Sequence, residues 1–275
     1  MKPIKIGILN LMHDKEDTQK RFEKIFKNSK NDIKVEFFYP KTKYQDKEVP
    51  ENVKAISQPL DLTKVADFDG FIITGAPIEH FDFKDVTYIE EIRCLLSELD
   101  RNHVQQLYLC WGAMAALNYF YGIKKVPLSQ KIFGIYPNEI LKAHPLLAGL
   151  SKDFLAPHAR YADMDIEQIA QDPRLEINSL SKNRNLLLVT SPPYPERTFL
   201  FAHLEYGRNA LRKEYQREIN AHPERNYQKP ENYFSRETPN LPEFKWKNTQ
   251  EHFFKNWINE LIKEKNYGRN LQLSY

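Results

Sequence analysis

The sequence is poor in cysteine, in Gly/Ser linkers and in long apolar runs. Only Cys94 and Cys110 occur among 275 residues, too few for a disulfide framework or for a zinc site built on cysteines. A single reactive thiol is still allowed, and no metal site is expected. The apolar run near the amino terminus is too short and interrupted for a signal peptide, and no segment reaches the length of a membrane span. We therefore expect a cytoplasmic protein with no membrane partner.

Neither sign of charge dominates the chain. Forty basic residues against 37 acidic ones give a formal net charge of +3, and these charges are spread along the sequence. This distribution gives no reason to expect a nucleic-acid partner. With 41% hydrophobic and 13% aromatic residues, the chain has ample material for a packed core. Because no repeat, low-complexity tract or flexible linker divides it, we predict a single domain over residues 1–275.

The first half of the chain alternates apolar runs with helical patterns. Residues 4–11, 33–39, 70–74 and the run before Cys110 read as buried strands, and a clear helical pattern covers 88–101. This alternation predicts an α/β fold with a mainly parallel sheet and helices on both of its faces. Ligands of such sheets bind outside the carboxyl ends of the strands, so the active site is expected there.

The pattern changes beyond Gly122. Three closely spaced strands, joined by short turns, are predicted at 175–180, 185–190 and 198–203. They suggest antiparallel pairing at one edge, and hence a mixed sheet. Two helices, at 208–220 and 249–263, close the chain, and the tail after Gly268 is expected to be loosely held.

The stretch 107–122 runs from a buried strand through Cys110 directly into an Ala-rich helix. A nucleophilic residue at such a point is typical of the strand-turn-helix nucleophile elbow, and Gly112 permits the sharp turn. The elbow would hold the cysteine at the amino end of a helix, where unpaired backbone N–H groups favour a thiolate. The alternative is a buried, inert cysteine that packs as a small hydrophobe.

A second group lies at the end of the last predicted strand, where one residue separates His203 from Glu205. Residues i and i+2 share one side of an extended chain, so the carboxylate can orient the imidazole while the imidazole meets Cys110. Alone, the pattern His-x-Glu is more often an exposed strand end. Combined with the predicted elbow, it points to a nucleophile, a base and an orienting group.

Several stretches together resemble the homoserine O-acyltransferase (homoserine transsuccinylase) family, whose flavodoxin-like fold is similar to that of class I glutamine amidotransferases. Among them are Phe-Ile-Ile-Thr-Gly-Ala-Pro-Ile-Glu, Leu-Cys-Trp-Gly-Ala-Met-Ala-Ala-Leu-Asn-Tyr-Phe-Tyr-Gly-Ile, Phe-Leu-Ala-Pro-His-Ala-Arg-Tyr and Ala-His-Leu-Glu-Tyr. They keep their order and spacing across nearly the whole chain. The resemblance implies ping-pong transfer of an acyl group from acyl-CoA to an amino-acid hydroxyl, with no permanently bound cofactor and a homodimeric assembly.

The resemblance also implies roles for individual residues. Cys110 falls on the position of the acyl thioester, His203 on that of the base and Glu205 on that of its acidic partner. Lys15 falls near the catalytic centre, where its charge would support the oxyanion. Lys131 and Arg217 fall on positions that would hold the carboxylate of the amino acid.

The oxyanion needs donors in place beforehand, and the candidates are the N–H of Trp111 with one from Gly75 or Ala76. Two further positions bear on specificity. Glu79 stands where the family associates Glu with acetyl and Gly with succinyl, and its carboxylate would repel a succinyl carboxylate, so acetyl-CoA is the predicted donor. Ala159 stands where homoserine-using members carry Ser.

The acceptor therefore stays open between L-homoserine, which would place the protein in methionine biosynthesis, and L-serine, which would place it in cysteine biosynthesis. Two readings from other classes also remain. One is a thiol hydrolase or amidase that uses the same Cys-His-Glu geometry with water as the acceptor. The other is a catalytically silent binding protein that has kept the fold.

Overall fold

The computed structural model describes residues 2–238 and 240–272. Its strands are β1 (Ile4–Leu9), β2 (Ile33–Tyr39), β3 (Gln58–Pro59), β4 (Gly70–Ile73), β5 (Gln105–Leu109), β6 (Lys125–Ile140), β7 (Phe154–Met164), β8 (Glu176–Ser181), β9 (Leu186–Thr190) and β10 (Arg197–Leu200). Its helices are α1 (Lys15–Asn28), α2 (Glu51–Lys54), α3 (Ile89–Arg101), α4 (Trp111–Tyr121), α5 (Ile166–Gln171), α6 (Ala210–Ala221) and α7 (Lys247–Gln272). Short 3-10 helices span Thr42–Tyr44, Leu62–Asp67, Phe83–Asp85 and Pro145–Leu147.

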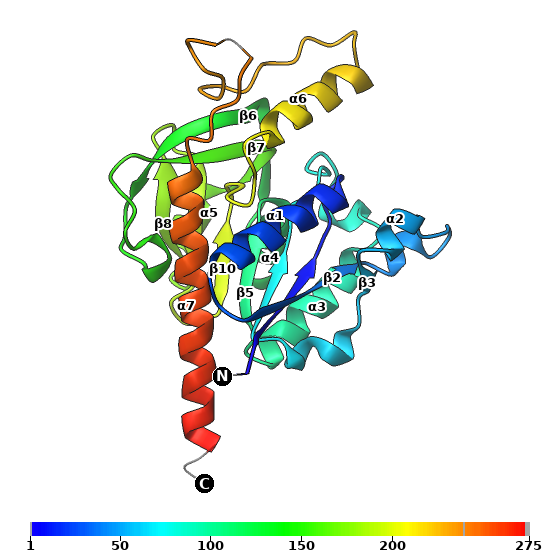
Figure 1. Cartoon of the computed structure of the whole chain (residues 1–275), viewed down its shortest axis with the longest axis vertical. Coiled ribbons are helices and arrows are strands. Elements are labelled where there is room, and N and C mark those ends of the chain that lie inside the picture. Colours follow the sequence, from blue (N-terminus) through cyan, green and yellow to red (C-terminus); the bar gives the residue numbers. More distant parts are fainter. Residues whose placement is uncertain (1, 239, 273–275) are drawn as a thin grey trace.

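Within the described residues these strands form one ten-stranded sheet in the order β3-β2-β1-β4-β5-β10-β9-β8-β6-β7 (Figure 1). Neighbouring strands are parallel from β3 to β10 and antiparallel from β10 to β7. This confirms the α/β fold with a mixed sheet. The placement of the antiparallel strands differs from the expectation, because β10 pairs with β5 inside the sheet and β7 forms the edge.

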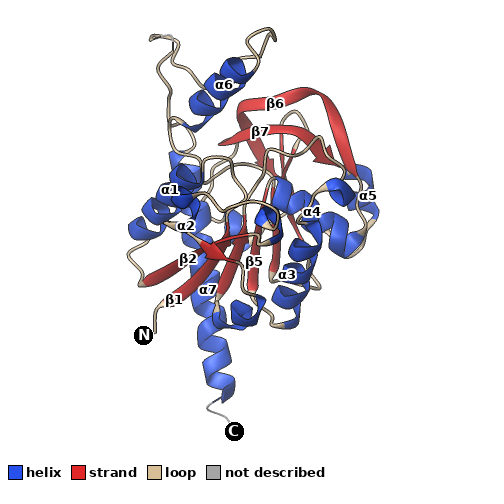
Figure 2. Ribbon diagram, turned by 90° about the vertical axis from the view of Figure 1, so that its right-hand side faces the viewer, coloured by secondary structure: helices blue, strands red, loops and turns tan. Residues whose placement is uncertain are grey.

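The antiparallel pair of β6 and β7 was not foreseen from the sequence. Its register shifts between Pro127 and Ile132, and Gly134 adopts φ +149°. These interruptions, together with the exposed first half of β6, hide the alternation by which a strand is recognised. Figure 2 shows the pair at the end of the molecule where α6 also lies.

Helices cover both faces of the sheet, as predicted (Figures 1 and 2). On one face, Leu95 of α3 and Met114 of α4 belong to the same buried cluster. On the other, Phe22 of α1 packs in a cluster with Trp257 of α7. Because strands covered on both faces must be apolar throughout, they read as continuous Ile, Leu and Phe runs.

Two features concern the ends of helices. Gly122, with φ +71°, ends α4 in the left-handed conformation that favours glycine. The last helix continues past the predicted end at Lys263 to Gln272, and residues 273–275 of the predicted tail lie outside the described residues. Among the described residues, no helix is both long enough and apolar enough to cross a membrane.

Candidate active site

Cys110 lies between the end of β5 and the first residue of α4. Its backbone has φ +46° and ψ −110°, a conformation that L-residues rarely adopt. The side chain is buried and lines a cavity at the carboxyl ends of the parallel strands. Since strained backbone persists only where the surrounding structure maintains it, this turn marks Cys110 as a candidate functional residue.

Two glycines allow three segments to meet at Cys110. A Cβ atom on Gly112 would lie only 2.7 Å from the carbonyl oxygen of Ile73, so glycine lets the start of α4 approach the end of β4. A Cβ atom on Gly75 would lie 3.1 Å from Cε1 of His203 and 3.2 Å from Cβ of Cys110. Gly75 therefore lies against both His203 and Cys110. Gly112 is needed for the close approach of α4 to β4 rather than for the turn at Cys110 itself.

His203 and Glu205 lie in a turn after β10, not on the strand where they were expected, because β10 ends at Leu200. The N–H of Tyr206 closes this turn by donating to the carbonyl oxygen of His203 at 3.0 Å. Nδ1 of His203 lies 2.8 Å from Oε1 of Glu205, and both side chains are buried. The predicted pair is thus formed by turn geometry rather than by strand alternation.

The electrostatics of this pair favour a charged imidazole. Burial by itself lowers the pKa of His203, but Cys110 and Glu205 outweigh burial and raise that pKa well above its usual value. A protonated imidazole beside a cysteine stabilises the thiolate, the nucleophilic form of the thiol. The second carboxylate oxygen of Glu205, Oε2, is buried and has no hydrogen-bond partner among the described residues.

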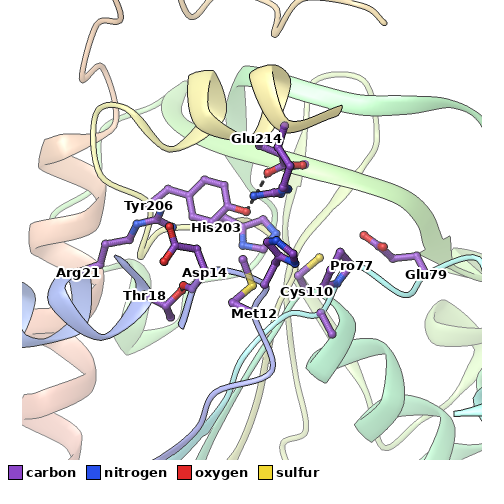
Figure 3. Close-up of a pocket in the computed structure, with 14 residues that line it drawn as sticks. Met12, Asp14, Thr18, Arg21, Pro77, Glu79, Cys110, His203, Tyr206 and Glu214 are labelled. Atoms are coloured by element: carbon purple, nitrogen blue, oxygen red, sulfur yellow. Dashed lines mark hydrogen bonds between the residues drawn. The ribbon is translucent and has the colours of Figure 1, made fainter. Parts of the chain in front are cut away.

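An aromatic stack fixes the imidazole ring, and the sequence analysis missed it. The ring of Tyr206 lies 4.3 Å from that of His203 with an interplanar angle of 25°. The guanidinium of Arg21 lies 4.8 Å from the centre of the Tyr206 ring, and the tyrosine hydroxyl donates to Glu214 at 3.0 Å (Figure 3). The adjacency of Tyr206 to the His-x-Glu pattern was the available signal. Nothing in the sequence places Arg21 or Glu214 beside it.

The cavity next to Cys110 measures about 50 Å³. Six of the residues singled out from the sequence line it, namely Cys110, His203, Ala76, Glu79, Ala159 and Arg217. A space of this size accepts a few small groups and is far below the volume of a typical cofactor pocket. Among the described residues, no cluster of three or more His, Cys, Asp or Glu side chains is placed to hold a metal ion.

Glu79 lies on the far side of Cys110 from Asp14 and Arg21 (Figure 3). Burial raises the pKa of its carboxyl group. The ammonium group of Lys125 donates to the carbonyl oxygen of Glu79 at 2.6 Å and also to that of Phe81, so β6 tethers the loop that carries Glu79. A carboxyl group is therefore held at one wall of the cavity.

Lys131, predicted to hold the carboxylate of the amino acid, lies outside the cavity lining and forms ion pairs with α6. Its ammonium nitrogen lies 2.5 Å from Oε1 of Glu214 and 2.6 Å from Oε1 of Glu218, and the residue is not part of the cavity lining. Burial lowers the pKa of Lys131, but the two carboxylates outweigh it and raise the pKa. In return, Lys131 holds the pKa of Glu214 below its usual value although burial alone would raise it.

Lys15, predicted to support the oxyanion, lies beside the cavity rather than in its lining. Its ammonium group donates to the backbone carbonyl oxygen of Asn10 and, at 3.5 Å, to that of Met12. The side chain lines a neighbouring groove and not the cavity of Cys110. Burial and the positive charge of Lys43 lower the pKa of Lys15 to about 7.

The three candidate oxyanion donors lie on the two segments that meet at Cys110. Trp111 is the first residue of α4, and Gly75 and Ala76 follow β4. In the part of the chain that the structure describes, no hydrogen bond uses the backbone N–H of any of the three. Of the three residues, Ala76 lines the cavity itself, and Gly75 and Trp111 do not appear in its lining.

Known proteins resemble this chain in both sequence and fold. The family model described as homoserine O-succinyltransferase matches residues 1–267. A serine O-acetyltransferase of Lactobacillus acidophilus is 56% identical over 94% of this chain and 95% of its own length. A homoserine O-acetyltransferase of Bacillus subtilis (strain 168) is 34% identical over 95% of this chain and 86% of its own length. A glutamine amidotransferase structure from Thermotoga maritima superimposes with a TM-score of 0.64 at 10% identity, covering 95% of this chain and 99% of that one, which confirms the fold. The chain thus belongs to the homoserine O-succinyltransferase family of acyltransferases that its motifs predicted.

Proposed function

We propose that this protein transfers an acetyl group from acetyl-CoA to the side-chain hydroxyl of L-serine, with L-homoserine as the competing acceptor. The observation that carries the proposal is the meeting of Cys110 and His203 at one small cavity, with Glu205 bound to the far side of the imidazole ring. The names of the relatives support the reaction, because the 56% identical protein is called a serine O-acetyltransferase and the 34% identical one a homoserine O-acetyltransferase.

In the first half-reaction, the turn at Cys110 acts as a nucleophile elbow that presents its thiolate to the thioester carbonyl of acetyl-CoA. A bond forms between Sγ and the carbonyl carbon, and the carbon–sulfur bond to CoA breaks. His203 gives its proton to the departing CoA thiolate. The N–H groups of Trp111 and of Gly75 or Ala76 stabilise the tetrahedral oxyanion.

In the second half-reaction, neutral His203 takes the proton of the acceptor hydroxyl as its oxygen attacks the acetyl carbon. The bond from that carbon to Sγ of Cys110 breaks, which restores the thiolate and imidazolium pair. Glu205 holds Nδ1 of the ring and stabilises its positive charge in both steps.

The acceptor is held by the wall of the cavity that α6 supplies. Arg217 lines the cavity and binds the carboxylate of the amino acid through its two-pronged guanidinium. Glu214, kept ionised by Lys131, binds the ammonium group. Lys131 is then a positioning residue that acts through Glu214 and not a direct ligand.

Glu79 and Ala159 set the two specificities. A succinyl group would bring its own carboxylate next to the ionised Glu79 in a small cavity, and this repulsion would cost about 1–4 kcal/mol. Ala159 offers no hydroxyl to the longer acceptor, L-homoserine, which is why we rank L-serine first. The cytoplasmic location, the single domain and the homodimer stay predictions from the sequence.

The decisive experiment compares acetyl-CoA with succinyl-CoA as the donor and L-serine with L-homoserine as the acceptor, following CoA release and the O-acyl product together. We expect the highest kcat/KM for acetyl-CoA with L-serine, and a gain of at least about tenfold in relative use of succinyl-CoA in Glu79→Gly. Without an amino acid the proposed mechanism releases at most one CoA per enzyme, so continued CoA release beyond that would favour the thiol hydrolase instead. Release by Cys110→Ala at the wild-type rate would refute the mechanism.

A further inference from the structure

The cavity beside Cys110 is too small for most of a CoA molecule, so the nucleotide of a CoA thioester must lie elsewhere. A groove of about 1070 Å³ adjoins the cavity. The walls of the two spaces share four residues, namely Met12, His13, Asp14 and Arg217. A ligand can therefore occupy the groove while its reactive end enters the cavity.

The groove carries an excess of positive charge. Its cationic side chains are Lys15, Lys43, Lys213 and Arg217, and its carboxylates are Asp14 and Glu16. The Asp14 carboxylate already accepts the N–H of Asp17 at 2.9 Å, where it caps α1. Nζ of Lys213 lies 2.8 Å from Oδ1 of Asp17, a third acidic residue of this turn, but half of the lysine side chain is exposed. Exposed Glu16 faces water.

Lys15 and Lys43 have an unusual environment for lysines. Lys15 is 7% exposed and Lys43 is partly buried, yet no carboxylate within the described residues pairs with either. Burial lowers the pKa of both, and each also feels a second lysine, Lys43 in the case of Lys15 and Lys47 in the case of Lys43. Like charges in a partly dry groove are unfavourable unless an anion neutralises them.

The part of the groove lining next to Lys43 also carries apolar and aromatic side chains. They are Tyr44, Pro50 and Val53, from the segment that joins the 3-10 helix Thr42–Tyr44 to α2. A tyrosine ring beside aliphatic side chains is a suitable surface for a flat heteroaromatic base. The groove thus combines cationic side chains with an aromatic ring, the two kinds of contact that a phosphorylated nucleotide requires.

We propose that this groove binds the adenosine phosphate end of the CoA thioester, with Lys43 and Lys213 at its phosphates and Tyr44 against its adenine. The pantetheine arm then passes Met12 and His13 to bring the thioester carbonyl to Cys110. Lys15, below the same groove, supports the phosphates through its charge. This inference rests on the proposed function, because it assumes that a CoA thioester is the acyl donor.

The test compares two donors with the same acetyl thioester, acetyl-CoA and S-acetyl-N-acetylcysteamine, which lacks the nucleotide. In Lys43→Met we expect the ratio of kcat/KM for acetyl-CoA to kcat/KM for the short donor to fall at least about tenfold, since a charged contact to a phosphate is lost. Lys43→Arg should restore most of the ratio. The matched control is Lys24→Met, which changes an exposed lysine of α1 outside the groove. This variant should have the same ratio of kcat/KM values as the wild type.

Calorimetric titration of the wild type and of Lys43→Met with CoA and with dephospho-CoA provides a second readout that needs no turnover. CoA should bind the variant at least about tenfold more weakly, and a smaller loss with dephospho-CoA would place the lysine at the ribose phosphate. An anion raises the pKa of Lys15, so binding near pH 7 should take up protons, seen as an enthalpy that depends on the buffer.

The outcomes separate this inference from the proposed function. An unchanged donor ratio in both Lys43→Met and Lys213→Met, with unchanged CoA affinity, would overturn the groove site while acetyl transfer stands. If the wild type used neither donor, the proposed function would fail, and the titration with CoA would still decide the groove. Should Lys43→Met fold poorly by circular dichroism, Lys213→Met supplies the same comparison.

Discussion

Two buried histidines, His203 and His158, lie on directly connected segments and differ in charge. The backbone N–H of His203 donates to the carbonyl oxygen of Pro157 at 2.9 Å. Both imidazole rings are almost entirely buried. Nevertheless, the pKa of His203 lies well above its usual value, where Cys110 and Glu205 overcome burial, and the pKa of His158 lies well below it.

The partners of each ring account for this difference. Burial penalises the charged form of both histidines. At His158, the positive charge of Arg160 adds to burial, since Nη1 lies 2.7 Å from Nδ1 of the ring. At His203, negative charge opposes burial and prevails. The sign of the nearest charge, rather than the depth of burial, decides the direction in which each pKa is shifted.

His158 therefore belongs to a structural network. Arg160 donates through Nη2 to Asp163 at 2.7 Å and through Nη1 to the carbonyl oxygen of Phe201 at 3.3 Å. Phe201 precedes the turn of His203, so the network ties β7 to the segment that carries the proposed base. One histidine takes part in the proposed chemistry, and the other helps to hold its segment in place.

Substituting each histidine by asparagine tests the comparison most strongly. His203→Asn removes the proposed base and should lower kcat by about a thousandfold. His158→Asn keeps an acceptor oxygen for Arg160 and should lower kcat by less than about tenfold. Steady-state release of CoA with L-serine measures both. Equal losses in the two variants, with intact folds, would contradict the division of roles.

Removing the negative partner makes the surroundings of His203 more like those of His158. Glu205→Gln keeps the side-chain shape but loses the charge, so the pKa of His203 should fall and kcat should drop by about a hundredfold. The pH dependence of Cys110 alkylation by iodoacetamide reports the thiolate and imidazolium pair. A profile identical to that of the wild type would show that Glu205 does not set the charge of the ring.

Ala159 lies between His158 and Arg160 on β7 but lines the cavity instead of joining their network. Ala159→Ser therefore changes only the side of the strand that faces the cavity. We expect kcat/KM for L-homoserine relative to L-serine to rise by up to about tenfold, since a new hydrogen bond becomes available to the longer acceptor. Ala162→Ser, a buried β7 position outside the cavity lining, serves as the control.

The pH dependence of stability should also separate the two histidines, with a smaller effect. The lowered pKa of His158 means that its contribution to stability is present above the unfolded value of 6.5 and is lost as the pH falls below it. The raised pKa of His203 acts in the opposite direction, since its contribution is present below 6.5 and is lost as the pH rises through its higher folded value. Below pH 6.5, the free energy of unfolding measured with denaturant should change less steeply with pH in His158→Asn than in the wild type.

The sequence predicted which residues of the candidate active site come together better than it predicted the elements that carry them. The runs of β1, β2, β4 and β5 were recognisable because most of their residues are apolar, as expected for parallel strands covered on both faces. The pair β6 and β7 was missed, since Pro127 and Gly134 interrupt a half-exposed strand. His203 and Glu205 were paired correctly although the expected strand is a turn.

Residues whose partners lie far along the chain were the ones misplaced. Lys131 was expected to meet the substrate, but Glu214 and Glu218 of α6, more than 80 residues away, hold its ammonium group. The stack of Arg21 on Tyr206 brings α1 to the proposed base, and no local pattern encodes that contact. Such pairings depend on how separate elements pack.

The sequence by itself determined the family, the α/β alternation and the order of Cys110, His203 and Glu205, because each is written in local patterns and in motifs that keep their spacing. Three features depend on the tertiary structure alone. They are the opposite pKa shifts of the two buried histidines, the pairing of Lys131 with carboxylates outside the cavity lining, and the connection of the cavity to a cationic groove. The physical reason is that burial and the nearest charge set protonation and pairing, and both depend on neighbours brought together by folding.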